Sequence, residues 1–146
     1  MSDESVQLDR VRRHWEHIGT DIDVSHEMYH DDAVLEFPQS GERFEGVETF
    51  KEWRSRYPAA VRYRLRRMTA RDGLVVVEAS VSYNDGPWMQ GVQLLEFRGD
   101  KVERERIYVT EPWDAPEWRA PWRSPTPADP PEQPPDPAAH PSDLDA

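Results

Sequence analysis

The sequence predicts an α+β domain in which a cone-shaped, curved antiparallel sheet wraps around N-terminal helices. Two observations favour this class. Apolar residues recur at helical spacing through most of residues 5–57, whereas residues 61–110 contain four long strand-like runs separated by turn signals. Helices followed by a series of antiparallel strands are typical of α+β domains. The sheet must curl around the helices in order to bury their apolar faces.

Three helices are predicted in the N-terminal part. Apolar residues at helical spacing place the first at residues 5–17. The second begins at a cap supplied by Asp21 or Asp23 and extends as far as Tyr29. The third spans residues 48–57, where aromatic residues recur three or four positions apart.

A short strand and a polar turn lie between the second and third helices. The strand covers residues 33–37 and stops at Pro38, because proline cannot donate a backbone hydrogen bond. Gly41 and Gly46 flank a turn or hairpin around the sequence ERFE. This order places a polar cluster at the expected mouth of the cone, namely Glu36, Gln39, Ser40, Glu42 and Arg43.

Four strands are predicted in the second half, at residues 61–69, 74–83, 88–98 and 102–110. Asp72-Gly73 is a typical hairpin turn between the first two. The strand at 74–83 is the most apolar and should be central. One of its faces carries Val75, Val77, Ala79, Val81 and Tyr83.

The C-terminal part divides into two segments. Residues 111–123 carry three tryptophans and three prolines, which predicts an irregular flap that packs through its indoles. We therefore expect one domain over residues 1–123. Residues 124–146 contain eight prolines and five carboxylates, with no lysine, arginine or aromatic residue, and predict a disordered acidic tail.

Composition excludes several classes of partner. The formal net charge of −11 argues against nucleic acid and anionic membranes, because both require a basic surface. The absence of cysteine excludes disulfides, thiol nucleophiles and thiolate metal sites. The charged N-terminus predicts no signal peptide, and no apolar run approaches the roughly 20 residues that span a bilayer. These features predict a cytoplasmic protein.

The segments YHDDAVLEFP, GVETFKEW and LLEFRGDKVERERIYV, in this order, resemble the SnoaL-like branch of the nuclear transport factor 2-like superfamily. The resemblance covers residues 5–122 and implies the α+β cone. The phrases QSGERF and EPWDAPEWRAPW are similar to an uncharacterised bacterial subgroup. This branch includes polyketide cyclases, ketosteroid isomerases and members with no assigned activity, so the resemblance implies a scaffold and not one reaction.

The catalytic pattern of ketosteroid isomerase can be compared with this chain residue by residue. The position of that enzyme's aspartate base falls on Phe37, which cannot accept a proton. Its oxyanion tyrosine falls near Arg13, and its protonated aspartate falls near Gln93. All three positions depart from the pattern, which argues against steroid isomerisation by that mechanism.

Three residues are candidate proton carriers, namely Glu36, Glu42 and His30. A carboxylate in a largely apolar cone would have a raised pKa, which suits a general acid or base. The alternative is structural: Glu42 and Arg43 form a solvated pair in the turn or pair with the C-terminal segment, and three of the four histidines in residues 14–30 lie on solvated faces or pack partly. His14, His17, His26 and His30 also raise the possibility of a metal site, but no carboxylate stands in a recognisable ligand pattern, and we predict neither a metal nor a cofactor.

Aromatic residues predict an internal pocket for a small, largely apolar molecule, since side chains from a curved sheet cannot fill the wide end of a cone. The expected lining residues are Tyr29, Phe37, Trp53, Tyr57, Tyr83, Trp88, Tyr108 and Trp113. Three functions stay open: cofactor-free acid–base chemistry of isomerase, cyclase or dehydratase type, non-catalytic binding of a small molecule, and a dimeric interaction module. A homodimer through the outer face of the sheet is expected in each case.

Overall fold

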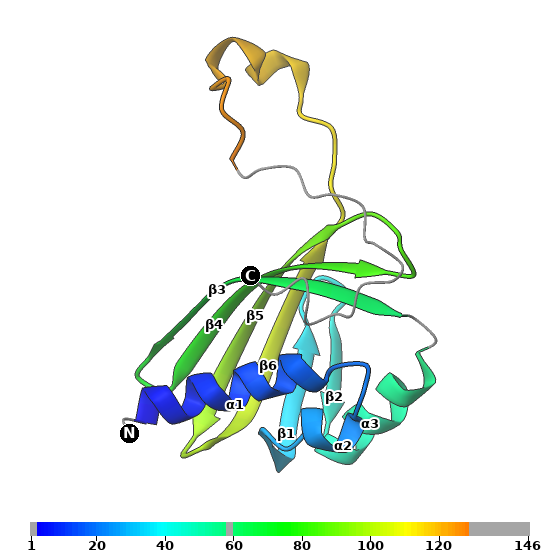
Figure 1. Ribbon diagram of the computed structural model, residues 1–146, viewed down its shortest axis with the longest axis vertical. Coiled ribbons are helices and arrows are strands. Elements are labelled where there is room, and N and C mark those ends of the chain that lie inside the picture. Colours follow the sequence, from blue (N-terminus) through cyan, green and yellow to red (C-terminus); the bar gives the residue numbers. More distant parts are fainter. Residues whose placement is uncertain (1–2, 58–59, 129–146) are drawn as a thin grey trace.

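A six-stranded sheet curves over three helices in the computed structural model, which describes residues 3–57 and 60–128 (Figure 1). The helices are α1 (Asp3–His17), α2 (Ile22–Ser25) and α3 (Val47–Arg56). The strands are β1 (Tyr29–Phe37), β2 (Glu42–Glu45), β3 (Val61–Arg71), β4 (Leu74–Tyr83), β5 (Met89–Arg98) and β6 (Lys101–Thr110). A 3₁₀ helix, η1 (Glu117–Trp122), follows the sheet. The predicted α+β class is confirmed.

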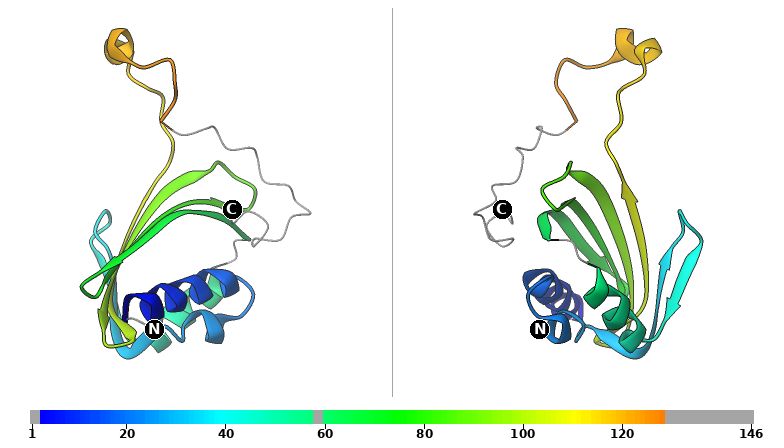
Figure 2. Two further views of the ribbon diagram at one scale, coloured as in Figure 1. Left: turned by 60° about the vertical axis from the view of Figure 1, so that its left-hand side comes forward. Right: turned by 90° about the vertical axis from the view of Figure 1, so that its right-hand side faces the viewer.

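The strands are arranged in the order β2-β1-β6-β5-β4-β3. Strands β3 to β6 form the expected antiparallel meander, whereas β1 pairs with β6 in parallel. The helices lie beneath the concave face of this sheet (Figure 2). β3 has an extra residue at Arg66, and β6 has one at Glu103, opposite Glu96 and Phe97. These register shifts add to the curvature, because such irregularities bend and twist a strand.

The core forms where the helices meet the concave face. The predicted inner face of β4 is confirmed, since Val75 and Val77 are at most 1% exposed. Trp15 of α1 packs against Tyr63 of β3, with ring centroids 5.2 Å apart. Phe50 of α3 contacts Tyr29 edge-on at 5.1 Å. No helix of the described residues is long and apolar enough to cross a membrane.

The second helix is shorter than predicted. Asp21 caps α2, its side chain accepting a hydrogen bond from the backbone of Val24 at 3.1 Å, but the helix ends at Ser25. Tyr29 instead begins β1, which starts four residues earlier than the sequence pattern indicates. The reason is tertiary, because Tyr29 pairs with Val102 in β6.

Residues 111–123 do not pack as the expected flap. They form an arm, residues 111–123 including η1, that extends away from the sheet (Figures 1 and 2). Trp113, Trp118 and Trp122 are 77%, 72% and 79% exposed, so the prediction of buried indoles is wrong for the single chain. Of the predicted acidic tail, residues 129–146 lie outside the described residues.

Candidate functional site

A cavity of about 730 Å³ lies between the helices and the concave face of the sheet. Helices α1, α2 and α3 supply one wall, and strands β1 and β3 to β6 supply the other. The lining is mostly apolar and includes Ile18, Phe37, Trp53, Val77, Val81, Ile107 and Val109. The volume falls within the range of about 300–1,000 Å³ that is typical of small-molecule sites.

Strand alternation explains which sheet residues reach this cavity. Ala79, Gly91 and Val109 are neighbours across three strands, and all three line it. Side chains two positions apart share a face, so Val77 and Val81 also point inward. The small residues Ala79 and Gly91 leave space at the middle of the sheet that larger side chains would fill.

A carboxylate is buried in the sheet behind the cavity. Glu105 is 0% exposed and lies in register between Leu35 of β1 and Leu95 of β5. It accepts hydrogen bonds from the Tyr29 hydroxyl and from the Gln93 side-chain amide. A buried charge requires such partners, because its removal from water destabilises the folded state by roughly several kcal/mol.

Arg54 supplies the positive charge that balances Glu105. Its Nη2 lies 4.0 Å from Glu105 Oε1, and its Nη1 donates to the Tyr29 hydroxyl at 3.2 Å. Nη1 also donates to His26 Nε2 at 3.0 Å. Burial alone would lower the pKa of Arg54, but contact with Tyr29 and Glu105 raises it, so the guanidinium stays charged.

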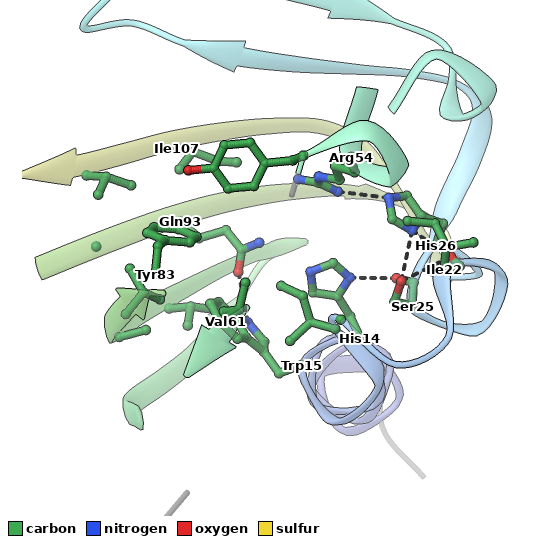
Figure 3. Close-up of a pocket in the computed structure, with 18 of the residues that line it drawn as sticks. His14, Trp15, Ile22, Ser25, His26, Arg54, Val61, Tyr83, Gln93 and Ile107 are labelled. Atoms are coloured by element: carbon green, nitrogen blue, oxygen red, sulfur yellow. Dashed lines mark hydrogen bonds between the residues drawn. The ribbon is translucent and has the colours of Figure 1, made fainter. Parts of the chain in front are cut away.

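His26 is bonded to this guanidinium, and His14 lies on the same side of the cavity (Figure 3). His26 Nδ1 donates to the Ile22 carbonyl at 2.7 Å, which leaves Nε2 to accept from Arg54. His14 Nδ1 donates to the Ser25 carbonyl at 2.5 Å. Burial, and then the charge of Arg54, lowers the pKa of each histidine from 6.5 to about 3.

The second ring nitrogen of His14 faces the cavity. Figure 3 shows one nitrogen of the ring bonded to Ser25 and the other turned toward the side where Gln93 and Trp15 lie. Within residues 3–57 and 60–128, His14 Nε2 forms no hydrogen bond. Trp15 Nε1 donates to Gln93 Oε1 at 3.2 Å, so the neighbouring acceptor is already occupied.

Four of the eight predicted ligand-binding residues line the cavity: Phe37, Trp53, Tyr57 and Tyr83. Burial raises the pKa of Tyr83, so its hydroxyl stays protonated. Tyr29 lies behind the cavity with its hydroxyl on Glu105. The other three lie away from the lining, Trp113 on the arm, Tyr108 at 39% exposure between two inward-facing residues of β6, and Trp88 before β5.

The three predicted proton carriers lie outside the cavity lining. Arg104 Nε donates to Glu36 at 2.7 Å, and this hydrogen bond lowers the pKa of Glu36, whereas an isolated carboxylate in an apolar cone would have a raised one. Glu42 accepts from the Ser40 hydroxyl at 2.6 Å, and His30 Nε2 donates to the Arg98 carbonyl at 2.6 Å. Other residues therefore supply the polar groups of the cavity.

His14 and Arg54, with Glu105 behind them, form the polar end of the cavity. The sequence analysis did not single them out as cavity residues, although each stands at a position where the local pattern expects an apolar residue. His14 follows Val11 by three positions and precedes Ile18 by four, which puts it on the apolar face of α1. Arg54 follows Phe50 by four positions on α3. Glu105 shares the strand parity of the inward-facing Ile107. In each case a polar residue occupies a core-facing position of a helix or strand, and this pattern could have indicated the polar end.

No group of three or more side chains that could hold a metal ion occurs in the part of the chain that the structure describes. The two buried histidines each have Nδ1 occupied by a carbonyl, and His26 Nε2 is occupied by Arg54. The polar end is therefore arranged for hydrogen bonding.

The curved sheet, the helices beneath it and the internal cavity define a nuclear transport factor 2-like cone. The chain belongs to the SnoaL-like domain family, whose model matches residues 8–105. No curated protein matches the chain.

Three solved structures illustrate the relationship. An NTF-2 like protein of unknown function from Burkholderia xenovorans LB400 is 34% identical over 86% of this chain and 98% of its own, with a TM-score of 0.76. A protein from Kribbella flavida, provisionally named a ketosteroid isomerase, is 21% identical over 90% and 98%, with a TM-score of 0.80. An LEH-like epoxide hydrolase from Mycobacterium tuberculosis is 17% identical over 74% and 85%, with a TM-score of 0.66. The last two likenesses establish the fold alone.

Proposed function

We propose that this protein binds a small, largely apolar molecule in its internal cavity. The observation that carries the proposal is the combination of about 730 Å³ of mostly apolar space with a buried, charged polar end at one wall. Apolar side chains of similar volume in place of Glu105 and Arg54 would stabilise the fold as well as this ion pair does, or better. A buried polar cluster that stability does not require supports a ligand site.

A cavity-filling variant tests this proposal. Gly91 lies in β5 with an ordinary strand backbone, and a Cβ there would meet only Ala79 O at 3.6 Å and Tyr108 O at 3.7 Å. Gly91→Leu should therefore fold and place its side chain in the cavity. Glu103→Leu, at an exposed position of β6, is the matched control.

The probe is 1-anilinonaphthalene-8-sulfonate, whose fluorescence rises in apolar sites. We expect the wild type and Glu103→Leu to bind it, and Gly91→Leu to lose at least about tenfold in affinity, because the added side chain occupies the space. Native mass spectrometry of the purified protein should also detect a co-purifying small molecule in the wild type. Equal probe binding by a folded Gly91→Leu variant would refute the cavity as the binding site.

Cofactor-free proton transfer is the second candidate function, and His14 is the observation that favours it. Its Nε2 carries a lone pair and faces the cavity beside the positive charge of Arg54, which would stabilise a developing oxyanion. A pKa of about 3 makes this imidazole a weak base at neutral pH, so we place binding first. Deuterium uptake from D₂O by the co-purified molecule, present with the wild type and absent with His14→Phe, would establish the reaction.

We also propose a homodimer in which the outer face of the sheet and the arm contact a second copy. Tyr108 is 39% exposed on that face, and the arm begins three residues later. A buried tryptophan removes about 150–250 Å² of surface from water. Two exchanged arms with three tryptophans each would bury roughly 900–1,500 Å², which reaches the size of specific interfaces.

A further inference from the structure

We propose that the ligand carries a hydroxyl group on an otherwise apolar body, and that this hydroxyl donates a hydrogen bond to His14 Nε2. The inference deepens the proposed function and rests on it. It names the chemical class of the ligand and the residue that selects it.

His14 is present as a single tautomer. The Ser25 carbonyl oxygen, 2.5 Å from Nδ1, can only accept a hydrogen bond, so Nδ1 carries the proton. In a neutral imidazole the other nitrogen is then a pure acceptor. Since the His14 side chain is 2% exposed and its Nε2 faces the cavity, this acceptor can be satisfied by a molecule inside it (Figure 3).

Each neighbouring acceptor already has a hydrogen-bond partner. Gln93 Oε1 accepts from Trp15, and the two carboxylate oxygens of Glu105 accept from Tyr29 and Gln93. The Tyr29 oxygen accepts from Arg54. His14 Nε2 is thus the acceptor that this network leaves open among the residues that the structure describes.

The charge of Arg54 limits which donor His14 can accept. Arg54 lies close enough to lower the pKa of His14, together with burial, so the ring stays neutral at physiological pH and does not itself become a donor. The same positive charge disfavours an ammonium group at this place. A neutral donor on an apolar body, an alcohol or a phenol, therefore fits better than an amine.

Paired probes of matched shape test the inference. 2-Naphthol has the hydroxyl donor, and 2-methoxynaphthalene has the same rings and oxygen without it. Isothermal titration calorimetry at pH 7 should show the wild type binding 2-naphthol at least about tenfold more tightly, because the methoxy compound leaves a buried acceptor unpaired. His14→Phe should bind both probes equally, and His17→Phe, at a half-buried position of α1 outside the cavity lining, should keep the preference of the wild type.

A measurement on the wild type removes any dependence on the folding of His14→Phe. In protein with ¹⁵N-labelled histidine, 2-naphthol should move the resonance of the unprotonated His14 Nε2, and 2-methoxynaphthalene should not. Equal affinities for the two probes with an unchanged Nε2 resonance would overturn the inference while leaving the cavity as a binding site. Failure of both probes to bind, with no effect of Gly91→Leu on fluorescent-probe binding, would overturn the proposed function as well.

Discussion

The hydroxyl of Tyr29 donates a hydrogen bond to the carboxylate of Glu105 across 76 positions of sequence. Tyr29 begins β1 and Glu105 lies in the middle of β6, so the contact joins the two strands that pair in parallel. Arg54 of α3 donates to the same hydroxyl. One buried cluster therefore ties together the first strand, the last strand and the third helix, and also forms the polar end of the cavity.

Glu105→Gln should destabilise the protein strongly. The new amide group would turn a donor toward Tyr29 or Gln93, which both donate to the carboxylate, and it would leave the Arg54 charge without its partner. We expect a loss of about 2–5 kcal/mol in the free energy of unfolding, measured by urea denaturation. Glu103→Gln, whose carboxylate is 44% exposed and 3.6 Å from Arg98, should change it by less than about 1 kcal/mol. Similar losses in the two variants would contradict this account of Glu105.

Arg54→Met should show that the charged pair is coupled. Removal of the guanidinium alone leaves Glu105 buried without a counter-charge, at a cost of about 3–5 kcal/mol. The double variant Arg54→Met with Glu105→Leu removes both charges and should recover part of that loss, as measured by urea denaturation. The coupling would be refuted if the two substitutions were simply additive.

Acidification should destabilise the folded protein below pH 6.5. Because the pKa values of His14 and His26 fall from 6.5 to about 3 on folding, the unfolded chain binds protons in this interval that the folded chain does not bind. Their contribution to stability is therefore complete above pH 6.5 and is lost as the pH falls toward 3. For each of the two histidines, the free energy of unfolding should fall by about 1.4 kcal/mol per pH unit within this interval.

Urea midpoints compared at pH 7.5 and pH 5 measure this loss. His14→Phe removes one of the two groups, so its stability should fall less steeply with pH than that of the wild type. A variant with the same steepness would show that His14 does not contribute.

The arm should control the oligomeric state. Simultaneous Trp113→Ala, Trp118→Ala and Trp122→Ala substitutions remove indoles that are 72–79% exposed in the single chain, so each monomer should still fold and keep the far-ultraviolet circular dichroism of the wild type. Sedimentation at the same protein concentration should give a dimer for the wild type and a monomer for the variant. A wild-type monomer, or a dimer that the substitutions leave intact, would refute the proposed role of the arm.

Deletion of residues 124–146 should leave the thermal midpoint within about 4 °C of the full chain, which corresponds to roughly 1 kcal/mol. The reason lies in composition, since this segment offers eight prolines and no aromatic residue to a core. Differential scanning calorimetry of the two chains makes the comparison. A larger decrease would show that the segment packs against the domain.

Local patterns predicted the fold well where one element decides its own structure. The two-residue periodicity of residues 74–83 predicted the inner face of β4, and Asp72-Gly73 predicted its hairpin, with both residues at positive φ of 52° and 82°. Tyr29 shows where prediction from local sequence fails. Its neighbours in the sequence are compatible with a helix, and only pairing with Val102 makes it the start of a strand.

The sequence by itself predicted the class of the fold and the four strands of the meander. It also predicted a cavity, and four of the eight residues that it assigned to the lining, Phe37, Trp53, Tyr57 and Tyr83, line the cavity of the structure. Tertiary structure alone decided which polar groups lie at one wall of that cavity and directly behind it. His14, Arg54 and Glu105 come from two helices and the last strand, and their charges and tautomers depend on contacts between segments far apart in the chain. Hydrogen bonding and desolvation act over a few ångströms in space, so spacing along the sequence could not predict them.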